Sequence, residues 1–384
     1  MNKKYILILL IISSILLLSG CWNYREIERL AIVSGLAVDK DENSGEYLLT
    51  TEIVDVKETM GKTTLTSKKI DSKGKTILDA IRNMIKISGK KLYLSHAKVF
   101  VISQDVAKEN IVPIIDWISR DHETRIDIDL LISKEKTAKE LLSQQSVTTD
   151  IRALEMNFML DANKSLAKSP KVGTYEFINT LESEGISPTL PAIGITTSEN
   201  KETSELSGTA IFKKEKLVGF LDEEESKYLL FIRDKIKGGL LSINMSENNP
   251  KDKVTLEIFK NKTKIKPVYS GENISINISI KTEVTIEEND TSINNIDEKG
   301  RAKLKNESEK FLEKQIGDLI KKVQNEFDSD IFGFGAKIKA EMPHLWKVIK
   351  DDWDDIFKDL DVVVNAQIDI RNSGITSKPI EVGD

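Results

Sequence analysis

Cys21 is the residue of this chain whose type and position most directly suggest chemistry. It is the only cysteine among 384 residues, and it directly follows Leu18-Ser19-Gly20. Lys3 and Lys4 stand near the start, and residues 5–18 form an apolar run interrupted only by two serines. A basic start, an apolar middle and small residues before a cleavage point are typical of a secretory signal peptide.

The apolar run is too short for a permanent membrane span. Its fourteen residues would extend about 21 Å as a helix, at about 1.5 Å per residue, whereas the hydrocarbon core of a bilayer is about 30 Å thick. We therefore predict that residues 1–20 are a signal peptide that is removed. No later stretch of about 20 apolar residues suggests a second span.

The Leu-Ser-Gly-Cys pattern resembles the lipobox of bacterial lipoproteins. In that chemistry the thiol of Cys21 takes a diacylglyceryl group, and small side chains let a peptidase cut between Gly20 and Cys21. The alternative, an ordinary buried cysteine, fits poorly with a lone cysteine at the end of an apolar run. Cys21 is thus the predicted lipid-attachment site, and acyl chains contribute about 0.8 kcal/mol per buried methylene to membrane binding.

Two groups of carboxylates have a spacing that could bind a cation or support acid–base chemistry. Asp127 and Asp129 share one face of an expected strand, with Glu123 upstream. Because isoleucines alternate with them, the simpler interpretation is the solvated face of a half-buried strand. The acids of residues 351–355 lack the loop spacing and central glycine of an EF-hand, so we interpret them as a helix start.

The three histidines are His96, His122 and His344, and none is at helix-face distance from another. His96 lies in an apolar run, so we interpret it as a structural, hydrogen-bonded residue, and His122 lies in a charged turn, where we expect it to be solvated. No glycine-rich phosphate loop and no nucleophile elbow occurs. We predict no catalytic, cofactor-binding or metal-binding residues and no enzyme activity.

Composition and charge narrow the class of protein further. Removing the signal peptide leaves 364 residues, too many for one simple core, and changes the formal net charge from −6 to −8. This acidic excess argues against a nucleic-acid partner and against electrostatic adhesion to anionic lipid. Once Cys21 is lipidated no free thiol remains, so disulfides, cysteine-ligated zinc and thiol catalysis are excluded in the monomer.

Strands, helices and several hairpins are interspersed, which predicts an α+β (mixed α/β) fold with mixed or antiparallel sheets and flanking helices. The clearest strand is 272–286, whose isoleucines share one face, and the clearest helix is 301–327. Residues 92–102 are expected to form a central strand and 126–132 a half-buried one. Asp222 is expected to cap a helix that runs to about residue 236.

The polar residues 198–205 are interpreted as a domain boundary. We accordingly expect an N-terminal α/β domain on the lipid tether (21–134) and a middle, mostly helical domain (135–205). A C-terminal α/β domain with an antiparallel sheet and the long helix follows (206–384).

Several stretches together resemble a known family. They are Cys21–Glu28, Ile32–Asp39, Leu94–Ile102, Gly208–Phe212, Leu217–Leu221, Phe332–Gly335 and, near the end, Pro343, Trp346, Trp353 and Val362–Val364. Their order and spacing over essentially the full mature chain resemble the Ger(x)C family, the lipoprotein C subunits of nutrient germinant receptors in endospore-forming bacteria. No single stretch is diagnostic by itself.

The resemblance implies a three-domain architecture and a lipidated Cys21 on the outer face of the spore inner membrane. It implies two integral membrane partners, an A subunit and a B subunit that resembles amino-acid transporters. Such complexes sense small nutrients and start germination. No catalytic residue carries over from the family, and no cofactor is implied.

Two questions stay open at this point. A substrate-binding lipoprotein of a transport system would share the anchor and the size. Such proteins usually have two similar α/β lobes, and the hairpins predicted here argue against that architecture. A cell-surface hydrolase would need a nucleophile or a pair of acids, and we find no candidate for either. The sequence shows no convergent polar cluster of the kind that ligand sites need. We therefore expect a scaffold that docks to the membrane subunits, and direct nutrient binding is undecided.

Overall fold

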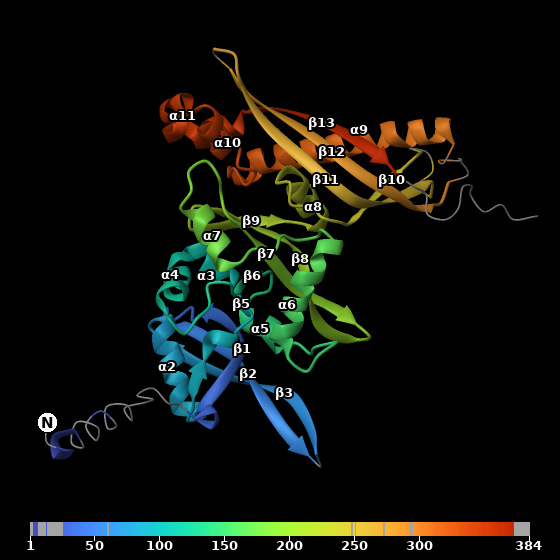
Figure 1. The fold of residues 1–384 in the computed structure, drawn as a ribbon. Helices are drawn as coiled ribbons and strands as arrows, with labels where there is room; N and C mark the ends of the chain where they lie inside the picture. Colours follow the sequence, from blue (N-terminus) through green and yellow to red (C-terminus); the bar gives the residue numbers. More distant parts are fainter. Residues whose placement is uncertain are drawn as a thin grey trace, which may run out of the picture.

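A computed structural model describes residues 3–6, 13, 26–59, 61–246, 249, 251–271, 273–291, 295 and 297–371. Cys21 and most of the predicted signal peptide lie outside these residues. The strands of the described part form a nine-stranded and a four-stranded sheet, each accompanied by helices (Figure 1). The predicted α+β class with mixed sheets is confirmed.

The first sheet has the strand order β3-β2-β1-β5-β6-β7-β8-β9, with β4 beside β1. Its strands are β1 (Leu30–Lys40), β2 (Tyr47–Thr59), β3 (Lys62–Gly74), β4 (Lys91–Tyr93), β5 (Val99–Ile102), β6 (Asp129–Ser133), β7 (Thr189–Ser198), β8 (Lys201–Lys213) and β9 (Lys216–Leu221). β1, β5, β6 and β7 are parallel, and the outer pairs are antiparallel. Parallel strands need cover on both faces, and β5 and β6 are buried at every position.

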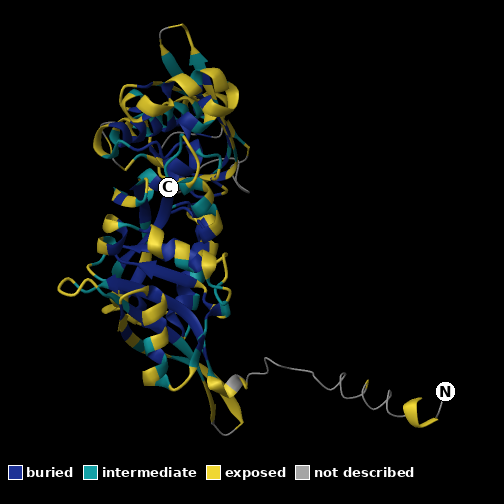
Figure 2. Ribbon diagram, turned by 90° about the vertical axis from the view of Figure 1, so that its left-hand side faces the viewer, coloured by how far each residue is buried: buried dark blue, intermediate teal, exposed yellow. Residues whose placement is uncertain are grey.

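Helices on both faces provide that cover. They are α2 (Ile77–Ser88), α3 (Gln104–Glu109), α4 (Val112–Arg120) and α7 (Thr174–Leu181) on one face, and α5 (Ala138–Ser143) and α6 (Arg152–Ala162) on the other. Alternate residues of β5 divide the two cores: Phe100 and Ile102 pack with the first group, Val99 and Val101 with the second. Figure 2 shows the buried strands between helices whose outer faces are exposed.

The second sheet has the order β10-β11-β12-β13. Its strands are β10 (Leu240–Asn244), β11 (Lys253–Tyr269), β12 (Ile274–Asn289) and β13 (Asp361–Ile370), and the accompanying helices are α8 (Glu223–Ile232), α9 (Glu298–Lys322), α10 (Phe334–Glu341), α11 (Pro343–Ile349) and α12 (Trp353–Lys358). The isoleucines of β12 and the apolar stripe of α9 belong to one core. The predicted strand 272–286 and long helix are thus confirmed, apart from a π-helical turn at Val323–Phe327.

Three local predictions were wrong. Residues 92–102 are β4, a 3-10 turn at Leu94–His96 and β5 rather than one strand. The strand expected from residue 126 begins at Asp129, and it is buried on both faces. Helix α8 ends at Ile232, before the expected end at about residue 236. Within the predicted boundary at 198–205, residues 201–205 belong to β8, where they pair with the end of β7.

The division into three domains (21–134, 135–205 and 206–384) stays a prediction. The chain passes from the nine-stranded sheet to the elements of the second sheet at Asp222, between β9 and α8. Helices α5, α6 and α7 pack on the nine-stranded sheet, and β7 and β8 are strands of it.

Candidate functional site

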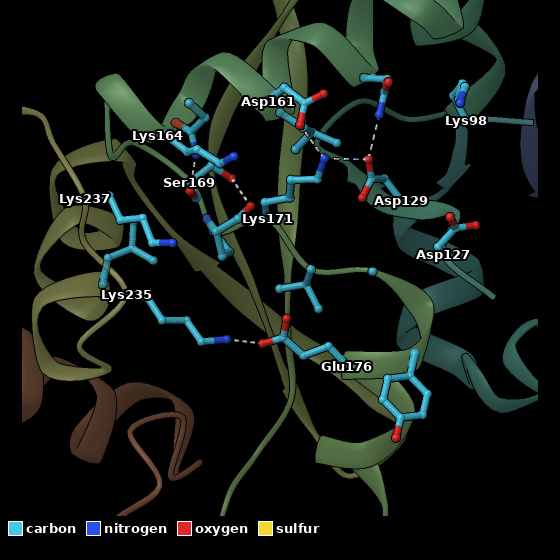
Figure 3. A pocket seen from close by; sticks show the side chains of 18 of the residues that line it. Lys98, Asp127, Asp129, Asp161, Lys164, Ser169, Lys171, Glu176, Lys235 and Lys237 are labelled. Carbon is cyan, nitrogen blue, oxygen red and sulfur yellow. Dashed lines mark hydrogen bonds and ion pairs between the residues drawn. The ribbon is translucent and has the colours of Figure 1, made fainter.

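A cleft of about 960 Å³ opens between the nine-stranded sheet with its helices and the end of α8. Its walls come from residues 95–98, 125–129, 157–176 and 229–237. Figure 3 shows the charged side chains gathered around it. The sequence predicted no convergent polar cluster, and that prediction was wrong because the four segments are far apart in sequence and come together only in the fold.

Asp127 and Asp129, singled out from the sequence, both line this cleft, but their environments differ. Asp127 is exposed and accepts two hydrogen bonds from Arg125, at 2.8 and 2.7 Å, which lower the pKa of its carboxyl. Asp129 is only 4% exposed, so the solvated face predicted for it was wrong. It accepts a 2.8 Å hydrogen bond from Asn157 and lies 3.4 Å from Lys171, and burial raises its pKa.

A second group of charges, which sequence reasoning missed, lies across the cleft. Lys164 follows α6, and Lys235 and Lys237 follow α8; Figure 3 places these three lysines on the side opposite Asp127. Lys235 forms an ion pair with Glu176 at the start of α7. The sequence does contain a sign of this group: residues 163–171 and 235–239 are rich in lysine and also contain proline or glycine, a composition typical of a basic loop.

Arg233, directly after α8, joins the two sheets at the edge of the cleft. It donates hydrogen bonds to the Thr189 hydroxyl (2.9 Å), to the Ser187 carbonyl (3.4 Å) and to the Ile331 carbonyl (2.7 Å). Enclosure of the guanidinium lowers the pKa of Arg233 to about 10, so the group stays charged at neutral pH. The arginine therefore links the start of β7 to the loop before α10.

Asp330 holds that loop. Its buried carboxylate accepts hydrogen bonds from four successive backbone N–H groups, those of Phe332, Gly333, Phe334 and Gly335, at 2.8–3.2 Å. Burial raises the pKa of Asp330 to about 6, although the four N–H groups act in the opposite direction. The stretch 332–335, one of those that resemble the Ger(x)C family, thus takes its shape from hydrogen bonds to the buried Asp330, which the sequence did not indicate as a functional residue.

The remaining candidates lie outside the cleft. His96, interpreted from the sequence as a structural, hydrogen-bonded residue, is exposed, and its ring lies edge-on to that of Tyr93 at 5.3 Å. His122 is 90% exposed, as predicted, and His344 is exposed as well. The acids of residues 351–355 stand at the start of α12, as expected. Within the described part of the chain, no group of three or more histidine, cysteine, aspartate or glutamate residues could hold a metal ion.

The cleft offers ionic and hydrogen-bonding chemistry. Its described lining contains lysine, arginine and carboxylate groups together with Ser95 and Tyr175, but neither histidine nor cysteine. Such an arrangement can bind a charged ligand and orient it.

Two family models match the chain. The model for the spore germination protein N-terminal domain matches residues 23–195, and the model described as spore germination B3/GerAC like, C-terminal, matches residues 207–374. Spore germination protein B3 of Bacillus subtilis (strain 168) is 27% identical over 95% of this chain and 96% of its own length. Spore germination protein KC of the same organism is 25% identical over 99% and 98%.

The fold is also similar to a solved structure. The crystal structure of the GerBC protein matches with a TM-score of 0.57 and 23% identity, over 88% of this chain and 97% of that one. In the part of the chain that the structure describes, no helix has the length and apolar character needed to cross a membrane. From the two family models and the relatives that span its length, this chain belongs to the Ger(x)C family of spore germination proteins.

Proposed function

We propose that this chain is the non-catalytic, lipid-anchored C subunit of a nutrient germinant receptor and that it acts by docking to integral membrane A and B subunits. The observation that carries the proposal is the match of both family models, in order, along the chain. Relatives that match over at least 96% of their own length are named as spore germination proteins. The docking partners and the outer face of the spore inner membrane as its location are part of the proposal.

The proposed anchor gives the molecule an orientation. Cys21 lies five residues before Glu26, the first residue of the continuous described chain, and five extended residues reach at most about 17 Å. In Figure 1 the chain enters the fold beside α2 and β3, at the end farthest from the second sheet. A lipid on Cys21 would therefore hold the nine-stranded sheet near the membrane, with the second sheet farther out.

The docking proposal is tested by co-purification. A tagged copy of the full chain is isolated from detergent-solubilised spore inner membranes, and the proteins that accompany it are identified by mass spectrometry. Two polytopic proteins, one of them similar to amino-acid transporters, are expected. If the permease and ATPase of an importer accompany it instead, the chain is a solute-binding lipoprotein and the proposal is wrong.

The anchor is tested by Cys21→Ala. Without the thiol no diacylglyceryl group can be attached, so the variant should appear either in the soluble fraction or as an uncleaved, unlabelled precursor. Fractionation and labelling with a radioactive fatty acid distinguish these forms. Mature, acyl-labelled variant protein in the membrane fraction would contradict the assignment of Cys21.

A further inference from the structure

We propose that the cleft binds a small organic anion, a carboxylate or a phosphate, between Lys164 and Lys237. This inference goes beyond the proposed receptor role and does not depend on it. It rests on how the charges of the cleft are paired, on the backbone contact that places the two lysines together, and on the size of the cavity.

Every carboxylate that lines the cleft already has an ion-pair partner within the protein. Each of the five lies beside a cation, although two of them share one lysine: Asp127 pairs with Arg125, Asp129 and Asp161 both pair with Lys171, Glu176 pairs with Lys235, and Asp234 pairs with Lys262. A cationic ligand would have to displace one of these internal partners. The cleft therefore has no free carboxylate to offer within its described lining.

Two lysines of the cleft, unlike its carboxylates, have no ion-pair partner within the described part of the chain. Within the described part of the chain, the ammonium groups of Lys164 and Lys237 have neither an ion-pair partner nor a hydrogen-bond acceptor. Lys98, on the opposite wall, is exposed, and its charge lowers the pKa of Asp127 by electrostatic interaction without a direct contact. These are uncompensated cations in a protein whose net charge is −6. A ligand that completes the charge pattern of the cleft must be an anion.

Tight backbone packing brings the two lysines together. A Cβ atom added to Gly238 would lie 2.8 Å from the carbonyl oxygen of Lys164, so the segment after α8 rests directly on the segment after α6. Gly239 has a φ of +103° and packs against Leu166 and Ala167. Because these backbone contacts hold the two segments together, electrostatic repulsion between the Lys164 and Lys237 ammonium groups cannot move the segments apart.

The segment that carries Lys164 is itself held by buried polar groups. Asn163 is 4% exposed; its side chain donates to the Ser169 carbonyl and accepts a hydrogen bond from the backbone of Lys168 at 3.1 Å. The Ser169 hydroxyl donates to the carbonyl of Gly208 at 2.7 Å. This wall of the cleft is therefore preorganised, which lowers the entropic cost of binding.

The size of the site indicates a small molecule. Its volume of about 960 Å³ lies at the upper end of the range usual for small-ligand pockets.

The walls of the cleft come from both regions matched by the family models, since Lys98 and Lys164 lie within residues 23–195 and Lys237 within residues 207–374. A bound anion would consequently favour one arrangement of the two regions, because it would contact both.

The test is a calorimetric titration of the full chain, purified in detergent, with citrate, succinate, inorganic phosphate and glycerol 3-phosphate at constant ionic strength. At least one of these anions should bind saturably with a Kd at or below about 1 mM, and choline should not bind. Lys164→Gln and Lys237→Gln should each raise that Kd by about tenfold, because each removes a charge-assisted contact. Comparison of the two carboxylates with the two phosphates identifies the preferred group.

The controls separate loss of the site from loss of charge or of folding. Lys347→Gln removes an exposed lysine from α11, outside the cleft, and should leave the Kd unchanged. Lys237→Arg keeps the charge and should bind nearly as well as the natural chain, and thermal unfolding checks that each variant is folded. The inference is wrong if none of the four anions binds, or if both glutamine variants bind like the natural chain. Because no membrane subunit is present, this result is independent of the co-purification.

Discussion

Buried carboxylates that accept hydrogen bonds from several backbone N–H groups recur in this protein. Asp39 accepts from Ala138 and Lys139 at 2.6 and 3.0 Å, about a hundred residues away. Asp330 accepts from four N–H groups within its own loop. Burying such a group is costly unless it is hydrogen-bonded, and burial raises the pKa of both carboxyls.

The raised pKa of Asp330 predicts a specific dependence of stability on pH. Its value of about 6 exceeds the ordinary aspartate value of about 3.9. The folded state therefore binds a proton that the unfolded state has lost, and the contribution of this group to stability falls as the pH rises from about 4 to 6, by about 3 kcal/mol.

Asp330→Asn removes this titration, and urea unfolding at several pH values measures its effect. The free energy of unfolding of the natural chain, minus that of the variant, should decrease between about pH 4 and pH 7. Other titrating groups cancel in this difference. A difference that stays flat or increases over that range would show that Asp330 does not bind its proton more tightly in the folded state.

At the scale of elements, Glu52 fastens α6 to the sheet. This residue of β2 is fully buried, and its carboxylate accepts hydrogen bonds from the backbone of Arg152 (3.0 Å) and Ala153 (2.8 Å), at the first turn of α6. The hydroxyls of Ser34 (2.9 Å) and Ser67 (2.7 Å) donate to the same carboxylate. A side chain from a strand thus caps a helix that begins a hundred residues later.

Glu52→Ala should therefore destabilise the fold by about 3–5 kcal/mol, because it leaves buried N–H and hydroxyl donors unpaired. Urea unfolding measures the change. Glu58→Ala is the matched control, since Glu58 is an exposed glutamate of the same strand, and it should change stability by no more than about 0.5 kcal/mol. Equal effects of the two substitutions would mean that Glu52 does not hold α6.

At the scale of the whole molecule, the two sheets are joined by close backbone contacts as well as by Arg233. The N–H of Ser187 donates to the carbonyl of Asp330 at 2.8 Å, and that of Ala336 to the carbonyl of Gly185 at 2.7 Å. A Cβ atom added to Gly185, whose φ is +73°, would lie 2.4 Å from the backbone of Gly335. The junction therefore leaves little freedom between the two halves.

Arg233→Ala should loosen this junction, since it removes three hydrogen bonds between the end of α8 and the two facing segments. We expect amide hydrogen exchange to become faster in residues 185–189 and 330–336, with little change in β5. Arg82→Ala, an exposed arginine of α2, is the control and should leave these amides unaffected. Unchanged exchange at the junction in Arg233→Ala would assign the coupling to the backbone contacts alone.

Local sequence pattern was sufficient for the elements with the clearest periodicity or capping signal. The alternating isoleucines of 272–286 predicted β12, the apolar stripe of 301–327 predicted α9, and Asp222 was identified as the cap of α8, where it accepts from the backbone of Glu225 at 2.8 Å. The mixed α+β class and the family also followed from the chain alone. Periodicity and capping are local properties, so no knowledge of distant packing was required.

Packing between distant segments decided the rest. Asp129 alternates with isoleucines, as a solvated residue would, yet α6 supplies Asn157 above it and the carboxylate is buried. The cleft exists only because four separated segments meet, and Lys164 and Lys237 become neighbours through the contact at Gly238. Whether a polar side chain is buried, paired or free depends on what the fold places opposite it, and a pattern along one strand or helix contains no information about that partner.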